Sequence, residues 1–137
     1  MTDTARFEAL EVGQSAHFSK TVTEADVILF AGVTGDMNPA HIDEVAASES
    51  RFKGRVAHGM LSASLISTVL GTRLPGPGTI YVGQTLRFTA PVRIGDTVTA
   101  RVTVRELDPE RRRARLETVC TTQDGTEVVT GEAEVLV

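Results

Sequence analysis

The chain has 137 residues, 41% of them hydrophobic, which is enough to bury one core, so we expect a single domain spanning residues 1–137. Eighteen acidic residues against fourteen basic ones give a net charge of −4, which argues against the broad positive field that binds nucleic acid. The N-terminus lacks the apolar core of a signal peptide, and no run approaches the roughly 18 apolar residues of a membrane helix. We therefore expect a soluble, cytoplasmic protein with no nucleic-acid or membrane partner.

The N-terminal part of the chain predicts one strand followed by one helix. Residues 14–22 mix polar and apolar side chains in the manner of a strand. Thr23 and Asp26, three positions apart, form a capping-box pattern that opens a helix over residues 24–33. Gly35 is expected to end that helix.

The loop over residues 34–41 carries the first candidate site. Asn38 is placed to cap a helix that has Pro39 at its first position, which puts His41 in the first turn beside free backbone N–H groups. Partial positive charge there disfavours an imidazolium, so a neutral ring is expected. Asp36, just before the cap, is then able to share one water molecule with His41. The alternative stays open that Asp36 only completes a turn and His41 is a surface residue.

A second candidate site lies where the chain enters an apolar helix. Residues 60–70 contain no charged side chain, so we expect this helix to be buried on all sides and to stop at Gly71. His58 and Gly59 stand at its N-terminus, where free N–H groups and a missing Cβ suit the oxygen of a developing enolate. Two plainer roles remain open: Gly59 relieves crowding, and His58 packs or caps the helix.

The C-terminal half predicts an antiparallel sheet. Its apolar residues recur with a period of two, and Cys120 falls within this pattern as a small buried residue. The expected strands cover residues 79–89, 97–107, 112–122 and 126–137. An α+β fold follows, in which the sheet curls around the buried helix. Its exposed edge makes a homodimer plausible.

Two motifs together resemble a known family. The run Thr-Gly-Asp-Met-Asn-Pro-Ala-His-Ile-Asp at residues 34–43 is followed by Val-Ala-His-Gly-Met at residues 56–60. This combination is similar to the signature of the MaoC-like or (R)-specific enoyl-CoA hydratases, the hydratase 2 group, whose hot dog fold wraps an antiparallel sheet around a long central helix. The resemblance extends from about residue 18 to residue 137.

The resemblance also implies roles for particular residues. The positions that match the family's catalytic set are Asp36, His41 and Gly59. We place Asn38, His58 and Ser67 among the substrate-binding residues. A hydroxyl of the central helix commonly orients the aspartate in this family, and we choose Ser67 over Ser62 and Ser64 for that role.

The implied reaction is syn addition of water to a trans-2-enoyl thioester, giving the (R)-3-hydroxyacyl thioester. Asp36 and His41 would hold the water, remove a proton as it attacks C3 and return one to C2, while the Gly59 N–H stabilises the thioester oxygen. No cofactor is expected beyond the thioester substrate itself. No metal is expected either, because His17, His41 and His58 lack ligand spacing.

Two other functions remain open on the same fold. A thioesterase also needs a carboxylate, a water molecule and an oxyanion site. A non-catalytic subunit that binds acyl thioesters keeps the fold without the chemistry, although the intact set of three catalytic positions argues against it. The acyl chain length, the direction of the reaction and the carrier, coenzyme A or an acyl carrier protein, also stay open.

Overall fold

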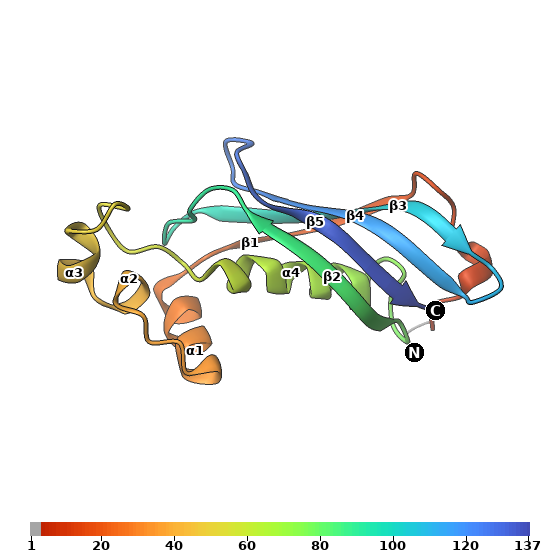
Figure 1. Ribbon diagram of the computed structural model, residues 1–137, viewed down its shortest axis with the longest axis horizontal. Coiled ribbons are helices and arrows are strands. Elements are labelled where there is room, and N and C mark those ends of the chain that lie inside the picture. Colours follow the sequence, from red (N-terminus) through yellow and green to blue (C-terminus); the bar gives the residue numbers. More distant parts are fainter. Residues whose placement is uncertain (1–3) are drawn as a thin grey trace.

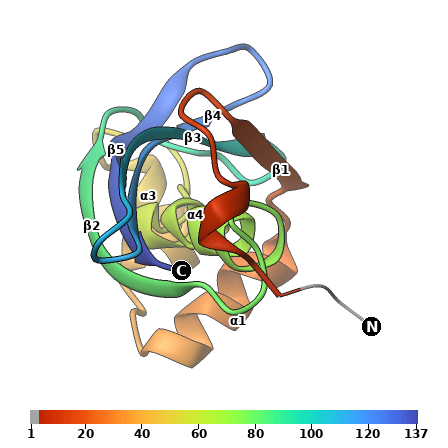
Figure 2. The same ribbon diagram turned by 90° about the vertical axis from the view of Figure 1, so that its right-hand side faces the viewer.

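A long helix, α4 (Gly59–Thr72), lies along the concave face of a five-stranded antiparallel sheet in the computed structural model, which describes residues 4–137. The strands are β1 (Ser15–Thr21), β2 (Ile80–Phe88), β3 (Thr97–Asp108), β4 (Arg113–Thr121) and β5 (Glu127–Leu136). Their order is β1-β3-β4-β5-β2, so β1 and β2 form the two edges. Seen end-on, the sheet curls around α4 (Figure 2). The predicted α+β hot dog architecture is confirmed.

The concave face of the sheet supplies most of the core. On β3, the alternate residues Val98, Ala100, Val102 and Val104 are all fully buried. The period-two pattern therefore marks the correct face, and the predicted strands agree with the observed ones to within two residues. Each fully buried aliphatic side chain contributes about 1.5–3 kcal/mol relative to an exposed one, so this face is a major source of stability.

Three helices gather at one end of the sheet, beyond the N-terminus of α4 (Figure 1). They are α1 (Glu24–Thr34), α2 (Pro39–Ile42) and α3 (Glu44–Ser48), and a short 3₁₀ helix (Phe7–Ala9) lies at the other end. No helix within residues 4–137 combines the length and apolar character needed to cross a bilayer.

The predicted start of α1 is confirmed and the helix ends at Thr34, one residue beyond the predicted range, whereas α3 was not predicted. The Thr23 N–H donates to Asp26 Oδ2 at 2.9 Å, and the Asp26 N–H donates to Thr23 Oγ1 at 3.2 Å, which completes the capping box. Gly35 ends α1 with a φ of 80°, a left-handed conformation that favours glycine. Asp43 caps α3 by accepting from the Ala46 N–H at 3.1 Å, a local signal that the loop prediction overlooked.

One face of α4 corrects the expectation of a helix buried on all sides. Met60, Ser64 and Ser67, spaced four and three residues apart, form a stripe that is exposed along the helix, and Met60 retains 52% of its surface. The absence of charge therefore marks a helix that faces the core on one side and an uncharged surface on the other. The helix also continues through Gly71 and ends at Thr72, one residue beyond the predicted stop.

Cys120 lies in β4, fully buried as predicted. Its Sγ–H donates to the Ser62 carbonyl of α4 at 3.6 Å. Burial raises the pKa of the Cys120 thiol to about 12, because the thiolate loses its hydration there. The side chain acts as a small apolar residue and not as a nucleophile at neutral pH.

Candidate active site

The turn between α1 and α2 holds Asp36 in place. Its N–H donates to Thr34 Oγ1 at 3.1 Å, and its Oδ1 accepts from the Asn38 N–H at 3.2 Å. Asn38 caps α2, because its Oδ1 accepts from the Ala40 N–H at 3.0 Å, and Pro39 occupies the first helical position. The predicted cap is therefore confirmed. It leaves little freedom to the backbone on either side of Asp36.

His41 has its ring fixed by a backbone carbonyl. Its Nδ1 lies 2.7 Å from the oxygen of Val56. Because a carbonyl oxygen only accepts hydrogen bonds, Nδ1 carries a proton, so Nε2 is the acceptor nitrogen in the neutral tautomer. The helix α2 has only four residues, so its dipole is too small to carry the expected argument for a neutral ring. The hydrogen bond to Val56 selects the tautomer instead.

His58 packs against the ring of His41 and binds the backbone of Asp36. Only 2% of its surface is exposed, and its Nε2–H donates to the backbone oxygen of Asp36 at 3.0 Å. Its ring stacks on that of His41 with centroids 3.9 Å apart, and the Phe30 ring lies 5.0 Å away on α1. The Nδ1 atom is buried and has no partner among the described residues. The predicted contact of His58 with substrate stays a prediction, and its one engaged nitrogen holds the chain at Asp36.

The fold brings together these three side chains, which come from two separate sequence motifs, residues 34–43 and 56–60. A carboxylate oxygen of Asp36 and one ring nitrogen each of His41 and His58 lie within 4.8 Å of one another. Two hydrogen bonds of about 2.8 Å that meet at one water oxygen span such a distance. The three groups also suit a metal ion by type. The rings of His41 and His58 are stacked with their centroids 3.9 Å apart and their planes inclined by 28°.

The cluster opens into one cavity of about 580 Å³ between the helical end and the sheet. The polar groups gather at the end where α2 and α4 begin, and the remaining wall is mainly apolar. The predicted site residues that line it are Asp36, Asn38, His41, His58 and Gly59. A pocket with convergent polar groups and apolar walls is typical of a site that binds a largely apolar ligand.

Gly59 is the first residue of α4, and His58 is its N-cap. The first N–H groups of a helix have no acceptor within it, so they are free to donate to a bound oxygen. A Cβ built on Gly59 would lie 2.7 Å from two ring carbons of Phe88, at the end of β2. Gly59 therefore does relieve crowding against Phe88, as the sequence left open, and its backbone N–H is also available as a donor.

The hydroxyl of α4 that reaches this cavity is Ser62 and not Ser67. Ser62 is 1% exposed, lines the cavity, and its Oγ has no partner among the described residues. Ser67 is exposed and lies in a second hollow with Tyr81 and Gln84. Within one chain Ser67 does not reach Asp36, which corrects our choice of hydroxyl. Ser62 follows Gly59 by three residues, so helical spacing was the signal available in the sequence.

Comparison with known proteins shows the family to which the chain belongs. The model of the MaoC like domain family matches residues 7–129. An (R)-specific enoyl-CoA hydratase from Rhodospirillum rubrum is 58% identical over 96% of this chain and 90% of its own length. A 3-hydroxybutyryl-CoA dehydratase from Methylorubrum extorquens is 56% identical over 96% of this chain and 83% of its own.

Among solved structures, the unliganded R-hydratase PhaJ1 from Pseudomonas aeruginosa superimposes with a TM-score of 0.92. It is 48% identical, and the match covers 98% of this chain and 86% of that one. An antiparallel sheet wrapped around a central helix thus defines the class, and the matching family model and relatives show that this chain belongs to the family of MaoC-like domains.

Proposed function

We propose that this chain is an (R)-specific enoyl-CoA hydratase, a hydro-lyase that adds water reversibly to a trans-2-enoyl thioester. The observation that carries the proposal is the meeting of Asp36 and His41 within 4.8 Å, beside the free N–H groups at the start of α4, in a cavity with mainly apolar walls. The relatives named as an (R)-specific enoyl-CoA hydratase and as a 3-hydroxybutyryl-CoA dehydratase, at 58% and 56% identity, support the same reaction.

The proposed chemistry uses groups of the chain itself. Asp36 and the unprotonated Nε2 of His41 hold one water molecule between them. As the water oxygen bonds to C3, the pair takes one proton from it, and the pair delivers one proton to C2 on the same side of the double bond. The product is the (R)-3-hydroxyacyl thioester, and the reverse sequence dehydrates it. Positioned proton transfer of this kind contributes roughly 10² to 10⁴ in rate.

Negative charge that develops on the thioester oxygen requires a donor as the bond to C3 forms. We assign that role to the N–H of Gly59, because it stands at a helix N-terminus and has no intrahelical acceptor. Ser62 lies one turn further along α4, and its buried hydroxyl is a second candidate donor in the same cavity. The apolar wall formed by the sheet receives the acyl chain.

The experiment that tests the function is product analysis with crotonyl-CoA and longer enoyl-CoA substrates. Hydration removes the conjugated chromophore while the thioester stays intact, and chiral analysis gives the (R) isomer. Release of free thiol would instead identify a thioesterase, and tight binding without turnover would identify a binding subunit. Running the same acyl groups on an acyl carrier protein determines which carrier the site prefers.

We further propose that the chain forms a homodimer through α4 and β2. The exposed stripe of Met60, Ser64 and Ser67 carries no charge, and the neighbouring edge strand exposes Ile80 and Val82. A second copy can cover this stripe and pair with the free edge of β2. Ser67 would then be covered by the partner. Sedimentation at micromolar concentration should give a dimer, and a fully active monomer would contradict it.

A further inference from the structure

The helix that carries His41, α2, is too short to be stable without contacts to other parts of the chain. It has four residues, and the last carbonyls of a helix have no N–H donors within it. Helices this short are unstable alone, because one turn does not offset the loss of backbone freedom. The placement of the His41 ring therefore depends on groups outside α2 that bind its backbone.

The segment of Arg55 and Val56 supplies those groups. The Val56 N–H donates to the Ala40 carbonyl at 3.0 Å, and the Arg55 Nε–H donates to the His41 carbonyl at 2.6 Å. In return, His41 Nδ1–H donates to the Val56 carbonyl at 2.7 Å. His41 is thus held at two points by adjacent residues, its backbone by Arg55 and its ring by Val56.

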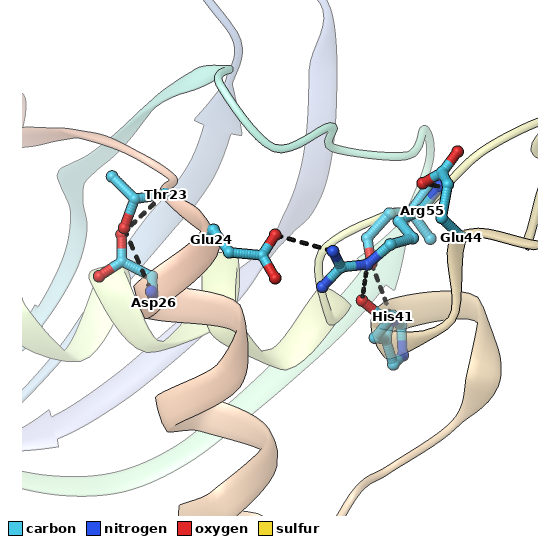
Figure 3. Close-up of polar contacts among 7 residues, drawn as sticks. Thr23, Glu24, Asp26, His41, Glu44 and Arg55 are labelled. Carbon is cyan, nitrogen blue, oxygen red and sulfur yellow. Dashed lines mark hydrogen bonds and ion pairs between the residues drawn. The ribbon is translucent and has the colours of Figure 1, made fainter.

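The guanidinium of Arg55 also reaches α1. Its Nη1–H donates to Glu24 Oε2 at 2.7 Å, and Glu24 is the first residue of that helix (Figure 3). The backbone N–H of Arg55 donates to Glu44 Oε2 at 3.3 Å. Glu24 begins α1 and Asp36 follows the C-terminal end of the same helix, so Arg55 connects the helix that leads to the carboxylate with the helix that carries the imidazole.

We propose that Arg55 is a positioning residue that fixes the distance and orientation of His41 relative to Asp36. The inference rests on the proposed hydratase function and adds a residue that does not line the cavity. Arg55 therefore acts on the reaction only through the backbone of His41. The chemistry of arginine suits this task, because Nε and Nη1 are fixed in one plane and donate to two acceptors on different helices.

The contribution of Arg55 to folding stability should be small compared with its effect on turnover. The Glu24 side chain is 57% exposed, whereas that of Arg55 is 14% exposed, and ion pairs with an exposed partner contribute little to folding. One nitrogen of the guanidinium, Nη2, is buried without a partner among the described residues, which further reduces the gain. Loss of Arg55 should thus affect turnover more than folding.

The test compares Arg55→Met and Arg55→Lys with a matched control, Arg73→Met. Arg73 also donates a guanidinium N–H to a backbone carbonyl, that of His17, but at the far end of α4. Hydration of crotonyl-CoA by the wild type is measured first. We expect Arg55→Met to lower kcat by about 10- to 100-fold, the scale of a small misplacement, with KM changed by less than about threefold. Lysine offers one ammonium in place of the fork, so Arg55→Lys should be similarly slow.

A second readout follows His41 directly. In protein labelled with ¹⁵N-histidine, the Nδ1 proton that is bonded to Val56 should give a resolved resonance, assigned by its loss in His41→Gln. It should broaden or move in both Arg55 variants and stay unchanged in Arg73→Met.

Folded Arg55 variants with wild-type kcat and an unchanged His41 resonance would overturn the proposal. The proposal would also be overturned if Arg55→Met and Arg73→Met lost the same amount of turnover and the same amount of melting temperature. Both arginines would then have only a structural role. If Arg55→Met does not fold, Arg55→Lys decides by the same criteria. A wild type without hydratase activity would refute the proposed function, and the resonance would still test the positioning.

Discussion

Replacing Gly59 by alanine places a single methyl group at the entrance of the candidate oxyanion site. The new Cβ would lie 2.7 Å from two ring carbons of Phe88, and ordinary contact begins near 3.4 Å, so the ring must shift by about 0.7 Å. Phe88 lines the same cavity and is 51% exposed, so it has room to turn. The displacement therefore changes the space beside the Gly59 N–H.

Folding should tolerate this change. A ring forced off its rotamer costs about 0.5–1.5 kcal/mol. Alanine stabilises a helix relative to glycine by up to about 1 kcal/mol, which offsets part of that cost. The free energy of unfolding should thus change by less than about 1.5 kcal/mol. Loss of one oxyanion donor costs about 10²–10³ in kcat, so turnover on crotonyl-CoA should fall by about 10²-fold if the thioester oxygen no longer reaches the N–H.

The assay includes Phe88→Ala and the double variant Gly59→Ala/Phe88→Ala. Neither Phe88→Ala nor the double variant has the Phe88 ring. Their difference in turnover therefore measures the effect of the Gly59 methyl group without its clash with that ring. The account predicts that turnover stays low in the double variant, because the methyl group still crowds the bound oxygen. Recovery to the level of Phe88→Ala would refute the reasoning and leave Gly59 only the role of accommodating Phe88.

Two further predictions concern the core. Leu65→Asp should lower the free energy of unfolding by several kcal/mol, more than Leu65→Ala, because Leu65 is 7% exposed and a carboxylate there has no partner; an unchanged melting temperature would place the helix elsewhere. Burial raises the pKa of Cys120 from its ordinary value of 9.0 to about 12, so the unfolded chain releases the proton first. Stability should therefore fall between pH 9 and 12, and Cys120→Ala should reduce that slope; equal slopes would contradict it.

Local chemistry accounts for the parts of the fold that the sequence predicted. Thr23 with Asp26, and Asn38 with Pro39, act within a few residues, so their capping roles appear in the structure as expected. The strands follow because a half-buried sheet imposes a period of two on side chains. The expected pairing of Asp36 with His41 rested on the same short-range reasoning.

Contacts between distant segments could not be predicted in this way. Arg55 reaches His41 and Glu24, which are 14 and 31 residues away, and no spacing rule connects them. His58 is separated from Asp36 by 22 residues, so its bond to that backbone appears only once α4 is placed. The choice of Ser67 over Ser62 failed because an uncharged helix does not show which face meets the cavity, although the three-residue spacing from Gly59 to Ser62 indicated the correct face.

The central claim is that Asp36 and His41 act together on one water molecule. The most direct measurement is kcat for crotonyl-CoA hydration by Asp36→Asn, His41→Gln and the double variant, each normalised to folded protein. The account predicts that each single variant loses roughly 10² to 10⁴ in kcat with a modest change in KM. The double variant should be little worse than either, because groups that act on one water are not additive. Near wild-type turnover in folded Asp36→Asn would contradict the account.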